Sequence, residues 1–423
     1  MNPNSTPGFA ATVGIDWADQ AHAVCLRDSA NGQVEHICLP HRAEAIAKWI
    51  ASLRSRFDGQ PIAVGLEQAR GGLIHALMQV EFLVLYPINP VTQARYRQAF
   101  SPSRAKDDPT DAELLMELVT HHRAKLAAWR PDDPRTRSLA RLIEKRRDAV
   151  HLRTRLTNML RDELKTYYPQ AFELVGDDLA APLALDFLRR WPSLPLLQKA
   201  KLDTVRRFYY AHNARRMDVV EQRLRSIGSM VALTTDDAIV GPARMQIEML
   251  LGQLRPLVQS ITAFEQAIAQ AFAAHPDAAL FASFPGAGPT LAPRLLAAFG
   301  SDRTRFATAG SLHQYSGIAP VTERSGKACW VHRRWARPLF VHQSFFEYAG
   351  QSVVHCAWAR EFYRGKMAAG KNHGTAVRAL AFKWQRIMWR CWQDRRPYDE
   401  TLCGNTRRIT EAHNLKTGQE TTP

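Results

Sequence analysis

Short apolar runs and helical patterns alternate between residue 10 and about residue 125 of this chain. Three successive apolar runs predict strands at 13–15, 21–26 and 34–39. Turns at Asp19-Gln20 and Asn31-Gly32 would join them. Helical patterns and two further strand patterns then alternate at 43–57, 62–66, 72–80 and 82–88. We therefore predict an α/β domain in which an antiparallel meander precedes β-α-β crossovers.

The order of these elements distinguishes between two α/β folds. A dinucleotide-binding fold is built from successive β-α-β units and would not begin with an antiparallel meander. A three-stranded meander followed by crossovers is instead the order expected of a ribonuclease H-like domain. We therefore expect residues 10–128 to form a ribonuclease H-like domain.

The middle of the chain has a helical pattern. A break at Trp129-Arg-Pro-Asp-Asp-Pro is followed by residues 135–168, which contain no Gly or Pro and place Leu and Ile at helical spacing. Further helices are expected over 186–225, and after Pro242 a second long helix over 245–273 has an apolar seam. Two long amphipathic helices that flank a middle segment predict a coiled-coil arm, formed within one chain or between protomers.

The last third of the chain is predicted to be mainly helical. Patterns at 340–348 and 374–392 carry aromatic residues that we expect in a core, namely Phe345, Phe346, Trp384, Trp389 and Trp392. The polar tail after Cys403 is predicted to be disordered. The patterns divide the chain into four segments, at 10–128, 129–274, 275–403 and 404–423.

The composition of the chain indicates a polyanionic partner. The 423 residues are 46% hydrophobic, enough for real cores, and 56 Lys and Arg against 40 Asp and Glu give a net charge of +16. A sequence pI near 9.9 favours nucleic acid as the partner. An anionic membrane would also attract this charge, but no apolar run approaches a bilayer span and the N-terminus lacks a signal-peptide pattern. We expect a soluble, cytoplasmic protein, associated with the nucleoid of a bacterial-type cell.

The cysteines exclude two kinds of structural site. Six are scattered along the chain, at Cys25, Cys38, Cys329, Cys356, Cys391 and Cys403. None forms a Cys-x-x-Cys pair, so neither a disulfide framework nor a zinc site is indicated, and reduced thiols are expected.

Much of the positive charge lies on the first long helix. Between Arg135 and Lys165 there are ten basic residues against four acidic ones. A charged helical face is often only a solvated surface, but this excess favours contact with a nucleic-acid backbone. The candidate contacts are Arg141, Lys145, Arg146 and Arg153.

Four carboxylates are the strongest candidate for chemistry. Asp16 ends the apolar run Val-Gly-Ile, Glu67 ends Val-Gly-Leu, and Asp108 and Asp111 lie three residues apart at the start of a predicted helix with Pro109 in its first turn. Each acid alone could be a cap. Together, acids at the ends of three segments predict a two-metal phosphodiester site, because clustered carboxylates need divalent cations to neutralise them. We expect Mg²⁺ or Mn²⁺, two per site.

A Gly-x-Gly turn opens the C-terminal third. In Phe284-Pro-Gly-Ala-Gly-Pro, Gly286 and Gly288 lie between two helical patterns. This arrangement resembles the hairpin of helix-hairpin-helix DNA-binding modules, in which glycines let the backbone approach a phosphate. A bare Gly-x-Gly is also what any tight helical connection would use. In a basic chain with an acidic quartet, we favour phosphate binding.

Two serines follow, each beside a glycine. Ser316 and Ser325 precede a basic stretch that contains Lys327, Arg333 and Arg334. A serine hydroxyl that attacks phosphorus needs cations to stabilise the charge on the phosphoryl oxygens, and this stretch supplies them. Most Ser-Gly pairs are simply turns, so the residues alone leave both interpretations open.

These motifs, in this order, resemble those of the IS110 family of insertion-sequence transposases, described as bridge-RNA-guided recombinases. The four carboxylates match the family's Asp-Glu-Asp-Asp pattern, and Lys106-Asp-Asp-Pro-Thr-Asp-Ala resembles its Lys-x-Asp-x-x-Asp-Ala signature. Pro285-Gly-Ala-Gly-Pro, Tyr315-Ser-Gly-Ile-Ala-Pro and Arg324-Ser-Gly-Lys resemble hallmarks of its C-terminal transposase domain. The resemblance runs from about residue 11 to about residue 400.

The resemblance implies a RuvC-like N-terminal domain, a coiled-coil middle and a C-terminal domain with a catalytic serine. By motif, that serine is Ser325, with Ser316 the second choice. The family further implies divalent metal at Asp16, Glu67, Asp108 and Asp111, and a serine that becomes covalently joined to DNA. The implied partners are donor DNA, target DNA and a structured noncoding guide RNA. Protomers would assemble into a dimer to tetramer, in which acids and serine meet across subunits.

One segment departs from the family pattern. Where many members have Lys-x-Gly-Asn or Lys-x-Gly-Asp after the serine loop, this chain has Arg334-Trp-Ala-Arg-Pro. The basic character is retained, but the contacts of that loop would differ.

Three other classes of protein share part of the pattern. A junction-resolving nuclease would share the acids and the fold and act by two-metal hydrolysis, but it would not need the serine loop. A sugar kinase or actin-like ATPase also opens with a strand ending in Gly-Ile-Asp, yet the paired glycine-rich phosphate loops of such enzymes are absent from this sequence. A non-enzymatic RNA-binding protein would explain the charge and leave the ordered carboxylates unexplained.

Overall fold

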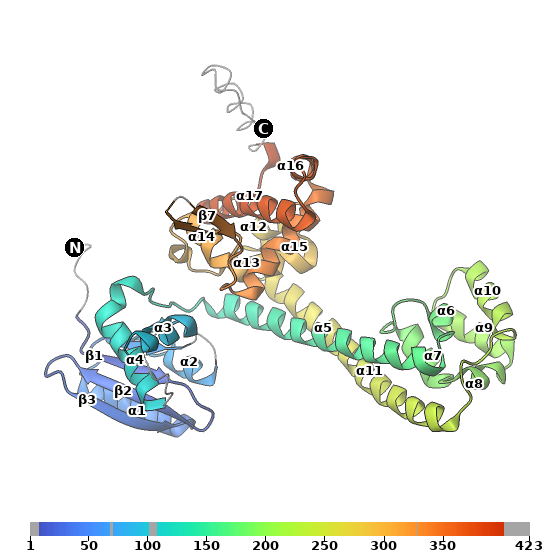
Figure 1. The fold of residues 1–423 in the computed structure, drawn as a ribbon, viewed down its shortest axis with the longest axis horizontal. Helices are drawn as coiled ribbons and strands as arrows, with labels where there is room; N and C mark the ends of the chain where they lie inside the picture. Colours follow the sequence, from blue (N-terminus) through green and yellow to red (C-terminus); the bar gives the residue numbers. More distant parts are fainter. Residues whose placement is uncertain (1–7, 68–70, 101–107, 327, 402–423) are drawn as a thin grey trace, which may run out of the picture. The chain divides into compact units, whose positions relative to one another are not determined.

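The computed structural model describes residues 8–67, 71–100, 108–326 and 328–401 of the chain. The chain divides into two compact units, Met1–Asp132 and Asp133–Pro423. Each unit is described by itself below (Figure 1). The predicted boundaries at 128, 274 and 403 stay predictions, and the polar tail 404–423 lies outside the described residues.

A five-stranded sheet forms the centre of the first unit. Its strands are β1 (Ala11–Asp16), β2 (Ala21–Asp28), β3 (Val34–Pro40), β4 (Ile62–Leu66) and β5 (Leu83–Pro87). They lie in the order β3-β2-β1-β4-β5. The first three pair antiparallel, whereas β4 is parallel to both β1 and β5. The predicted meander followed by crossovers is therefore confirmed.

Helices cover both faces of this sheet. They are α1 (Ala43–Arg56), α2 (Gly72–Leu77), α3 (Pro90–Phe100), α4 (Asp108–His122) and the 3-10 turn η1 (Arg123–Lys125). Val13 and Ile15 of β1 pack with Ile46 of α1 and Leu73 of α2. On the opposite face, Cys25 of β2 packs with residues of α4. Val24 and Leu26, on either side of Cys25, join the first core. Strand β2 therefore contributes to both cores, because successive side chains of a strand point to opposite faces.

The second unit is mainly helical. Its first part contains α5 (Pro134–Tyr167), α6 (Ala171–Val175), α7 (Pro182–Arg190), α8 (Leu194–Gln198), α9 (Leu202–Ala211), α10 (Met217–Ile227) and α11 (Asp237–Ala273). Its second part contains α12 (Ala278–Ala282), α13 (Gly288–Phe299), η2 (Arg303–Arg305), α14 (Ala309–Ser316), β6 (Val321–Ser325), β7 (Ala328–His332), α15 (Leu339–His355), α16 (Ala357–Ala368) and α17 (His373–Asp394). The mixed α/β sheet with a mostly helical remainder agrees with the predicted fold class.

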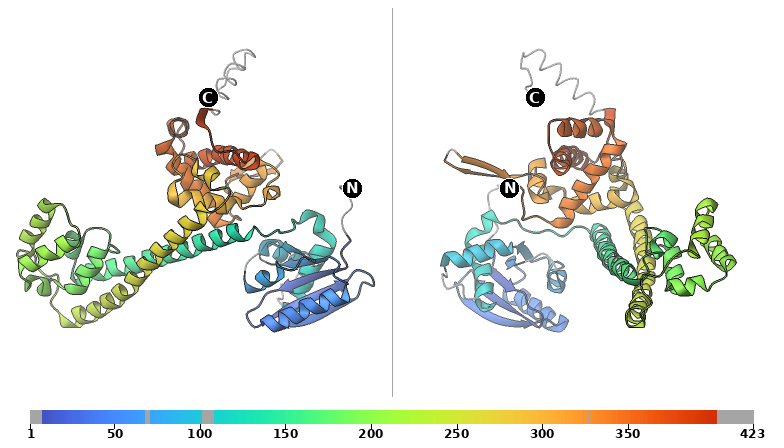
Figure 2. Two further views of the ribbon diagram at one scale, coloured as in Figure 1. Left: turned by 180° about the vertical axis from the view of Figure 1, so that it is seen from behind. Right: turned by 45° about the vertical axis from the view of Figure 1, so that its right-hand side comes forward.

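The two long helices α5 and α11 pack antiparallel along their lengths (Figures 1 and 2). Thr136, near the start of α5, hydrogen-bonds His275 just after α11, with 2.9 Å between the side-chain atoms. Farther along, Arg146 pairs with Glu265 at 2.6 Å. A helix pair within one chain is therefore present, and its description as a coiled coil stays a prediction.

The expected start of the second long helix was wrong. The helix begins at Asp237 and continues through Pro242 and Pro256. Each internal proline removes a backbone hydrogen bond and disfavours the helix by about 3 kcal/mol. The side chain of Asp236 caps the helix by accepting from Ala238 N, and a buried seam that includes Ile247 packs against neighbouring helices. Tertiary packing of this seam outweighs the local signal of the prolines.

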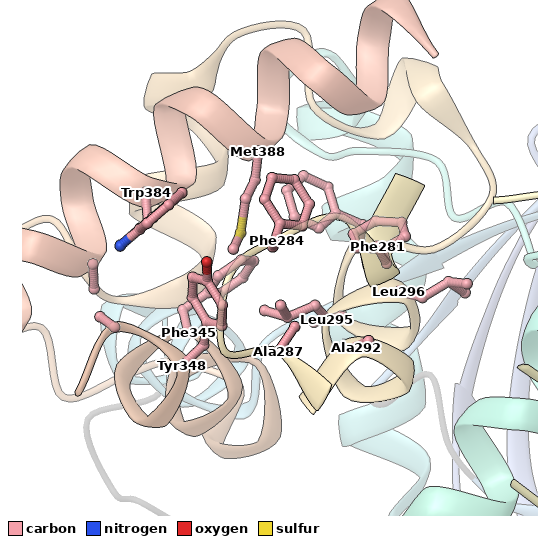
Figure 3. Close-up of a cluster of buried hydrophobic side chains, with 14 of the residues drawn as sticks. Phe281, Phe284, Ala287, Ala292, Leu295, Leu296, Phe345, Tyr348, Trp384 and Met388 are labelled. Atoms are coloured by element: carbon pink, nitrogen blue, oxygen red, sulfur yellow. The ribbon is translucent and has the colours of Figure 1, made fainter. Parts of the chain in front are cut away.

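Two separate cores lie at the two ends of the helix pair. One combines Leu156 and Leu160 of α5 with Leu250 of α11 and the helices α6 to α10. The other combines Leu139 of α5 with the C-terminal helices. Figure 3 shows the second core, in which side chains from α12, α13, α15 and α17 meet, among them Phe281, Leu295, Phe345, Trp384 and Met388. Of the aromatics predicted in a core, Phe345, Trp384 and Trp392 are at most 1% exposed, and Phe346 and Trp389 pack against the same cluster.

A two-stranded hairpin, β6-β7, interrupts the C-terminal helices. Ser325 pairs with Ala328 across its tip and Val321 pairs with His332 at its base. Every residue of β7 is exposed, and all of β6 is exposed except the half-buried Val321. In the right-hand view of Figure 2 the two strands project away from the helices of this unit. The apolar pattern does not predict this hairpin, because neither strand has a buried face.

Two expectations about composition can be compared with the described residues. Cys25, Cys38, Cys329, Cys356 and Cys391 are free thiols, and Cys403 lies outside the described part of the chain. Among the helices that the structure describes, none has the length and apolar character needed to cross a membrane.

Candidate functional site

The first two acids lie at the same edge of the sheet. Asp16 is the last residue of β1, and Glu67 directly follows β4. These strands are parallel neighbours in which Ile15 pairs with Leu66. The next residues along each strand are therefore Asp16 and Glu67, so both carboxylates come from the carboxyl end of the sheet, as the sequence predicted.

The direction of α4 brings the other two acids to this edge. Thr12, near the start of β1, hydrogen-bonds Thr120 in the last turns of α4, with 2.8 Å between the hydroxyl oxygens. Gly14 lies against Ala112 in the first turns of the same helix. Helix α4 therefore runs antiparallel to β1. Its first turn, with Asp108 and Asp111, lies at the end of β1 where Asp16 is found.

Two glycines allow α4 to lie directly on the sheet. Gly14 and Gly65 are register partners in β1 and β4. A Cβ at Gly14 would come within 1.9 Å of the carbonyl oxygen of Ala112, and one at Gly65 within 2.7 Å of that of Leu115. Only glycine leaves room for this contact.

The same glycines explain the two acidic motifs. Gly14 and Asp16 are two residues apart, so strand alternation directs Asp16 to the face that α4 covers. Gly65 and Glu67 have the same spacing. The repeated Gly-x-acid spacing thus encodes a helix contact and a carboxylate on one face. Both glycines are visible in the sequence beside the acids, but their contact with α4 was not predicted.

Asp111 is buried and already has a cation. Its side chain is 2% exposed and forms an ion pair with Arg97 of α3, whose side chain is 18% exposed. Gln93, one turn earlier in α3, donates from Nε2 to the backbone oxygen of Asp111 at 3.3 Å. Arg97 supplies the compensating charge that a buried carboxylate needs. Asp16 is also buried, at 9% exposure, whereas Asp108 is exposed and Glu67 is half-buried.

The donor set suits a hard divalent cation, since it consists of carboxylate oxygens only. Within the described residues, however, no three His, Cys, Asp or Glu side chains converge closely enough to hold one ion. Arg97 also lines a cavity of about 410 Å³ together with Tyr96, Thr110, Glu113, Leu114, Glu117 and His121. A divalent cation at Asp111 would therefore compete with Arg97 for the carboxylate.

The two candidate serines lie in opposite environments. Ser325 is exposed at the tip of the β6-β7 hairpin. Ser316 ends α14 and is 0% exposed; its hydroxyl donates to the carbonyl of His313 at 3.2 Å and accepts from Gln385 Nε2 at 2.8 Å. A hydroxyl enclosed in this way cannot reach a DNA phosphate without unpacking α14 from α17. The geometry favours Ser325 over Ser316 as a nucleophile.

Arginines gather at the base of this hairpin. Arg333 and Arg334 directly follow β7, and the guanidinium of Arg333 lies near Gly374 at the start of α17. Burial, together with the charges of Arg333 and Arg337, lowers the pKa of Arg378. Burial also lowers the pKa of His342, as do Arg337, Arg378 and Arg333. The base of the hairpin is therefore strongly cationic, while Lys327 lies outside the described residues.

The predicted contacts on α5 form ion pairs within the chain. Exposed Arg141 pairs with Glu144, exposed Lys145 pairs with Asp148, and Arg146 pairs with Glu265 of α11. Arg153 is half-buried. Exposed pairs of this kind are worth little, so a phosphate can displace the acids at low cost. Their assignment to nucleic acid stays a prediction.

The Gly-x-Gly turn connects α12 and α13. Gly286 has φ +78° and a Cβ there would lie 2.7 Å from the ring of His355, so packing against α15 already requires glycine. Phe284 and Ala287, on either side of Gly286, point into the core in Figure 3. Gly288 has φ +54° and open space around it at the N-terminus of α13. Of the two glycines, Gly288 is the one with space for a ligand.

Two features of the site were missed from the sequence. Helix α3, with Gln93 and Arg97, was not predicted, although Asn89-Pro90 is a helix-start signal and Asn89 accepts from Val91 N at 2.8 Å. Trp330 was also missed, and it is 55% exposed on the serine hairpin. Residues 328–331 are a run of only four apolar residues, too short to predict a strand on its own.

Comparison with known proteins gives one consistent class. Residues 13–169 match the DEDD model of IS110 transposases, described as "Transposase", and residues 278–364 match a model described as "Transposase IS116/IS110/IS902 family". A Streptomyces coelicolor protein named as a mini-circle transposase for IS117 is 30% identical over 92% of this chain and 95% of its own length. The insertion element IS900 42 kDa protein of Mycobacterium paratuberculosis is 26% identical over 91% of this chain and 96% of its own.

A second Streptomyces coelicolor relative is the insertion element IS110 43.6 kDa protein, 26% identical over 71% of this chain and 74% of its own. The two matched models cover most of the α/β unit and part of the C-terminal helices, in the order in which the acids and the serines occur. The class of protein is therefore an insertion-sequence transposase. The chain belongs to the IS110 family of transposases.

Proposed function

We propose that this transposase is a recombinase that cleaves and exchanges DNA strands through a covalent bond between Ser325 and DNA. The observation that carries the proposal is the contrast between the two serines, because Ser325 is exposed at a hairpin tip and Ser316 is enclosed in a core. A water-activating nuclease with the same acids would have no use for an exposed serine beside a cationic hairpin base.

The N-terminal unit is proposed to be a RuvC-like, ribonuclease H-like domain. Its strand order β3-β2-β1-β4-β5, with an antiparallel meander and parallel crossovers, supports this. Asp16, Glu67, Asp108 and Asp111 would hold two divalent cations, Mg²⁺ or Mn²⁺, which would polarise the scissile phosphate and stabilise the leaving oxygen when bound. Gly14 and Gly65 position these acids by letting α4 lie against the sheet.

The serine step is a transesterification. The Ser325 Oγ forms a bond to phosphorus as the bond from phosphorus to a deoxyribose oxygen breaks, and the serine proton leaves while that oxygen gains one. The phosphodiester is exchanged rather than hydrolysed, so a later attack by a DNA hydroxyl can reverse the step with no external energy source. Arg333 and Arg334 at the hairpin base provide positive charge that favours the phosphate.

The proposed partners are donor and target DNA, a structured noncoding guide RNA and further copies of this chain, from dimer to tetramer. The net charge of +16 supports a polyanionic partner. Arg141, Lys145, Arg146 and Arg153 of α5 would contact phosphates, and base pairing with the RNA would choose the sequence, by analogy with other RNA-guided systems. Gly288 would bring the α13 N-terminus to a phosphate, as in helix-hairpin-helix modules, with Gly286 shaping the turn.

The deciding experiment traps the covalent intermediate. The full-length protein, with the RNA that copurifies with it and DNA from the ends of its element, is stopped with denaturant after reaction and examined for protein joined to labelled DNA. We expect the adduct with Mg²⁺ and not with EDTA. Ser325→Ala and Asp111→Asn should each abolish it, while a Ser316→Ala protein that remains folded should form it. Adduct formation by Ser325→Ala would overturn the assignment, as would cleavage without adduct by the unaltered protein.

A further inference from the structure

One face of the β6-β7 hairpin carries both Ser325 and an exposed tryptophan. Residues directly opposite each other on antiparallel strands share a face, and so do residues two positions apart on one strand. Ser325 lies opposite Ala328, and Trp330 follows Ala328 by two positions and lies opposite Glu323. Ser325 and Trp330 are therefore diagonal neighbours on one face, with their Cα atoms about 7–8 Å apart. Val331 pairs with Thr322 and lies on the opposite face.

Trp330 contributes nothing to a core of the described chain. It is 55% exposed, and its neighbour Val331 is 64% exposed. A two-stranded hairpin with no covered face is marginally stable in water, so placing an indole there gains little for folding. A large exposed aromatic beside a candidate nucleophile offers a flat apolar contact for a ligand on this face.

The charges near this face indicate the chemistry of the ligand. Arg333 and Arg334 follow β7 directly. The acid opposite Trp330, Glu323, accepts from His332 Nε2 at 2.9 Å, and this contact raises the pKa of His332. The local acid is thus paired while the arginines at the base favour a polyanion. Aromatic rings beside arginines are the combination with which proteins bind single-stranded nucleic acid, since every base has a face that can stack.

We propose that Trp330 stacks on an unpaired base next to the phosphate that Ser325 attacks, and so positions that phosphate. This inference rests on the proposed function, because it takes Ser325 as the nucleophile. A strand that brings its phosphate to Ser325 along this face passes over Trp330, whose ring lies within one nucleotide of the serine. The base must be unstacked from its duplex to reach the indole, so Trp330 selects locally opened DNA.

The test separates stacking from chemistry. Full-length Ser325→Ala protein, which cannot form the serine bond, is titrated with a short single-stranded oligodeoxynucleotide that contains 2-aminopurine, whose fluorescence is quenched by stacking. We expect strong quenching. Adding Trp330→Ala should remove most of the quenching and weaken binding about tenfold, because it removes the partner of one stacked base. Adding Trp330→Phe should restore much of both.

A matched control moves the indole without changing composition. The double change Trp330→Val and Val331→Trp keeps two strand-forming residues but places the indole on the opposite face of the hairpin. It should behave like Trp330→Ala, whereas Val331→Ala should behave like the parent protein. Unchanged quenching in Trp330→Ala would overturn the inference. Quenching that is unchanged while the oligomer dissociates in ultracentrifugation would also overturn it and assign Trp330 to a contact between copies.

The same proteins with Ser325 restored keep the two proposals distinguishable. If Trp330→Ala forms adduct on DNA with a preformed bubble at the cleavage site more readily than on intact duplex, positioning of an unstacked base is supported. If Trp330→Ala quenches as strongly as its parent protein while adduct formation still depends on Ser325, only the inference about Trp330 is overturned. Adduct formation by Ser325→Ala, with the quenching difference present, defeats only the assignment of the serine.

Discussion

The sheet edge with Asp16 and Glu67 and the β6-β7 hairpin with Ser325 present their proposed reactive groups in different ways. Both have a glycine within two residues of the group. At the sheet edge, Gly14 is buried under α4, and the absence of a Cβ allows helix and strand to touch. In the hairpin, Gly326 follows Ser325 with φ +57° and has open space where a Cβ would lie, so the glycine serves the turn alone.

This difference separates a site made by tertiary packing from one made by a local turn. The acids come from three segments, and their convergence depends on the register of β1 with β4 and on the contact of α4 with both. The serine depends on one pair of short strands. Changes in the packed region should therefore act through stability, and changes in the hairpin should act on chemistry with little effect on stability. Four predictions test this comparison, from the largest expected effect to the smallest.

Gly14→Ala should do the most damage. The new Cβ would lie 1.9 Å from Ala112 O and 2.4 Å from Met116 N, both backbone atoms of α4, so the helix must shift. We expect a loss of about 3 kcal/mol in the free energy of unfolding of the N-terminal unit. Hydrogen exchange of β1 and α4 in urea measures it for this unit separately, since a chain of two units need not unfold in one step. Gly252→Ala, at an exposed helical position with open space, is the control and should stabilise α11 by up to about 1 kcal/mol. Equal exchange in both variants would contradict the packing role of Gly14.

Arg97→Gln should cost about 2 kcal/mol without metal, because it leaves the buried carboxylate of Asp111 without its cation. Mg²⁺ should then replace the lost charge, so the rise in melting temperature on adding Mg²⁺ should be larger for Arg97→Gln than for the unaltered protein. Arg95→Gln, at an exposed position of the same helix, should change neither quantity. An identical Mg²⁺ response in all three proteins would argue against metal binding at Asp111.

Ser316→Ala and Ser325→Ala should have opposite consequences. Removing the Ser316 hydroxyl leaves the buried Nε2 of Gln385 without its acceptor, at a cost of about 1.5 kcal/mol. Removing the exposed Ser325 hydroxyl should change stability by less than about 0.5 kcal/mol. Urea unfolding of the C-terminal helices measures both. A larger loss for Ser325→Ala than for Ser316→Ala would show that the hairpin is part of the core.

Acid should weaken the core and strengthen the hairpin. Burial lowers the pKa of His313 to about 4, with Arg386 adding to the effect and the hydrogen bond to the Phe382 carbonyl opposing it. Between pH 6.5, the ordinary pKa of histidine, and about pH 4, His313 binds a proton in the unfolded chain but not in the folded one. The stability that neutral His313 provides is therefore lost as pH falls through that window. The opposite holds for His332, because its hydrogen bond to Glu323 raises its pKa. The stability that the charged His332–Glu323 pair provides is fully present below pH 6.5 and is lost as pH rises through the pKa of His332 in the folded protein.

Unfolding between pH 7 and pH 4.5 provides the measurement for His313. His313→Gln keeps a donor for the Phe382 carbonyl but cannot titrate, so the acid-dependent loss should be smaller than in the unaltered protein. For the hairpin, nuclear magnetic resonance of labelled His332 should show a pKa above that in Glu323→Gln. Equal acid sensitivity of the native and His313→Gln proteins would mean that other groups control the core.

Much of the sheet could be predicted from the sequence, and the reason is local. Each strand run shows its own apolar pattern, and the order of a meander and crossovers follows from the order of the runs along the chain. The candidate acids were also visible, because each ends such a run or begins a helix. The second long helix was misjudged at Pro242, since packing of its seam outweighs a local breaker.

What the sequence alone determined is therefore the order of the elements, the basic character, and the residue types at the candidate sites, all of which depend on neighbours along the chain. Only the tertiary structure decided that Gly14 and Gly65 lie against α4 and that Arg97 forms an ion pair with Asp111. It also decided that Ser316 is enclosed, whereas Ser325 shares an exposed face with Trp330. These depend on which distant segments meet, and contacts between distant segments are set by the packing of whole faces rather than by any short stretch of residues.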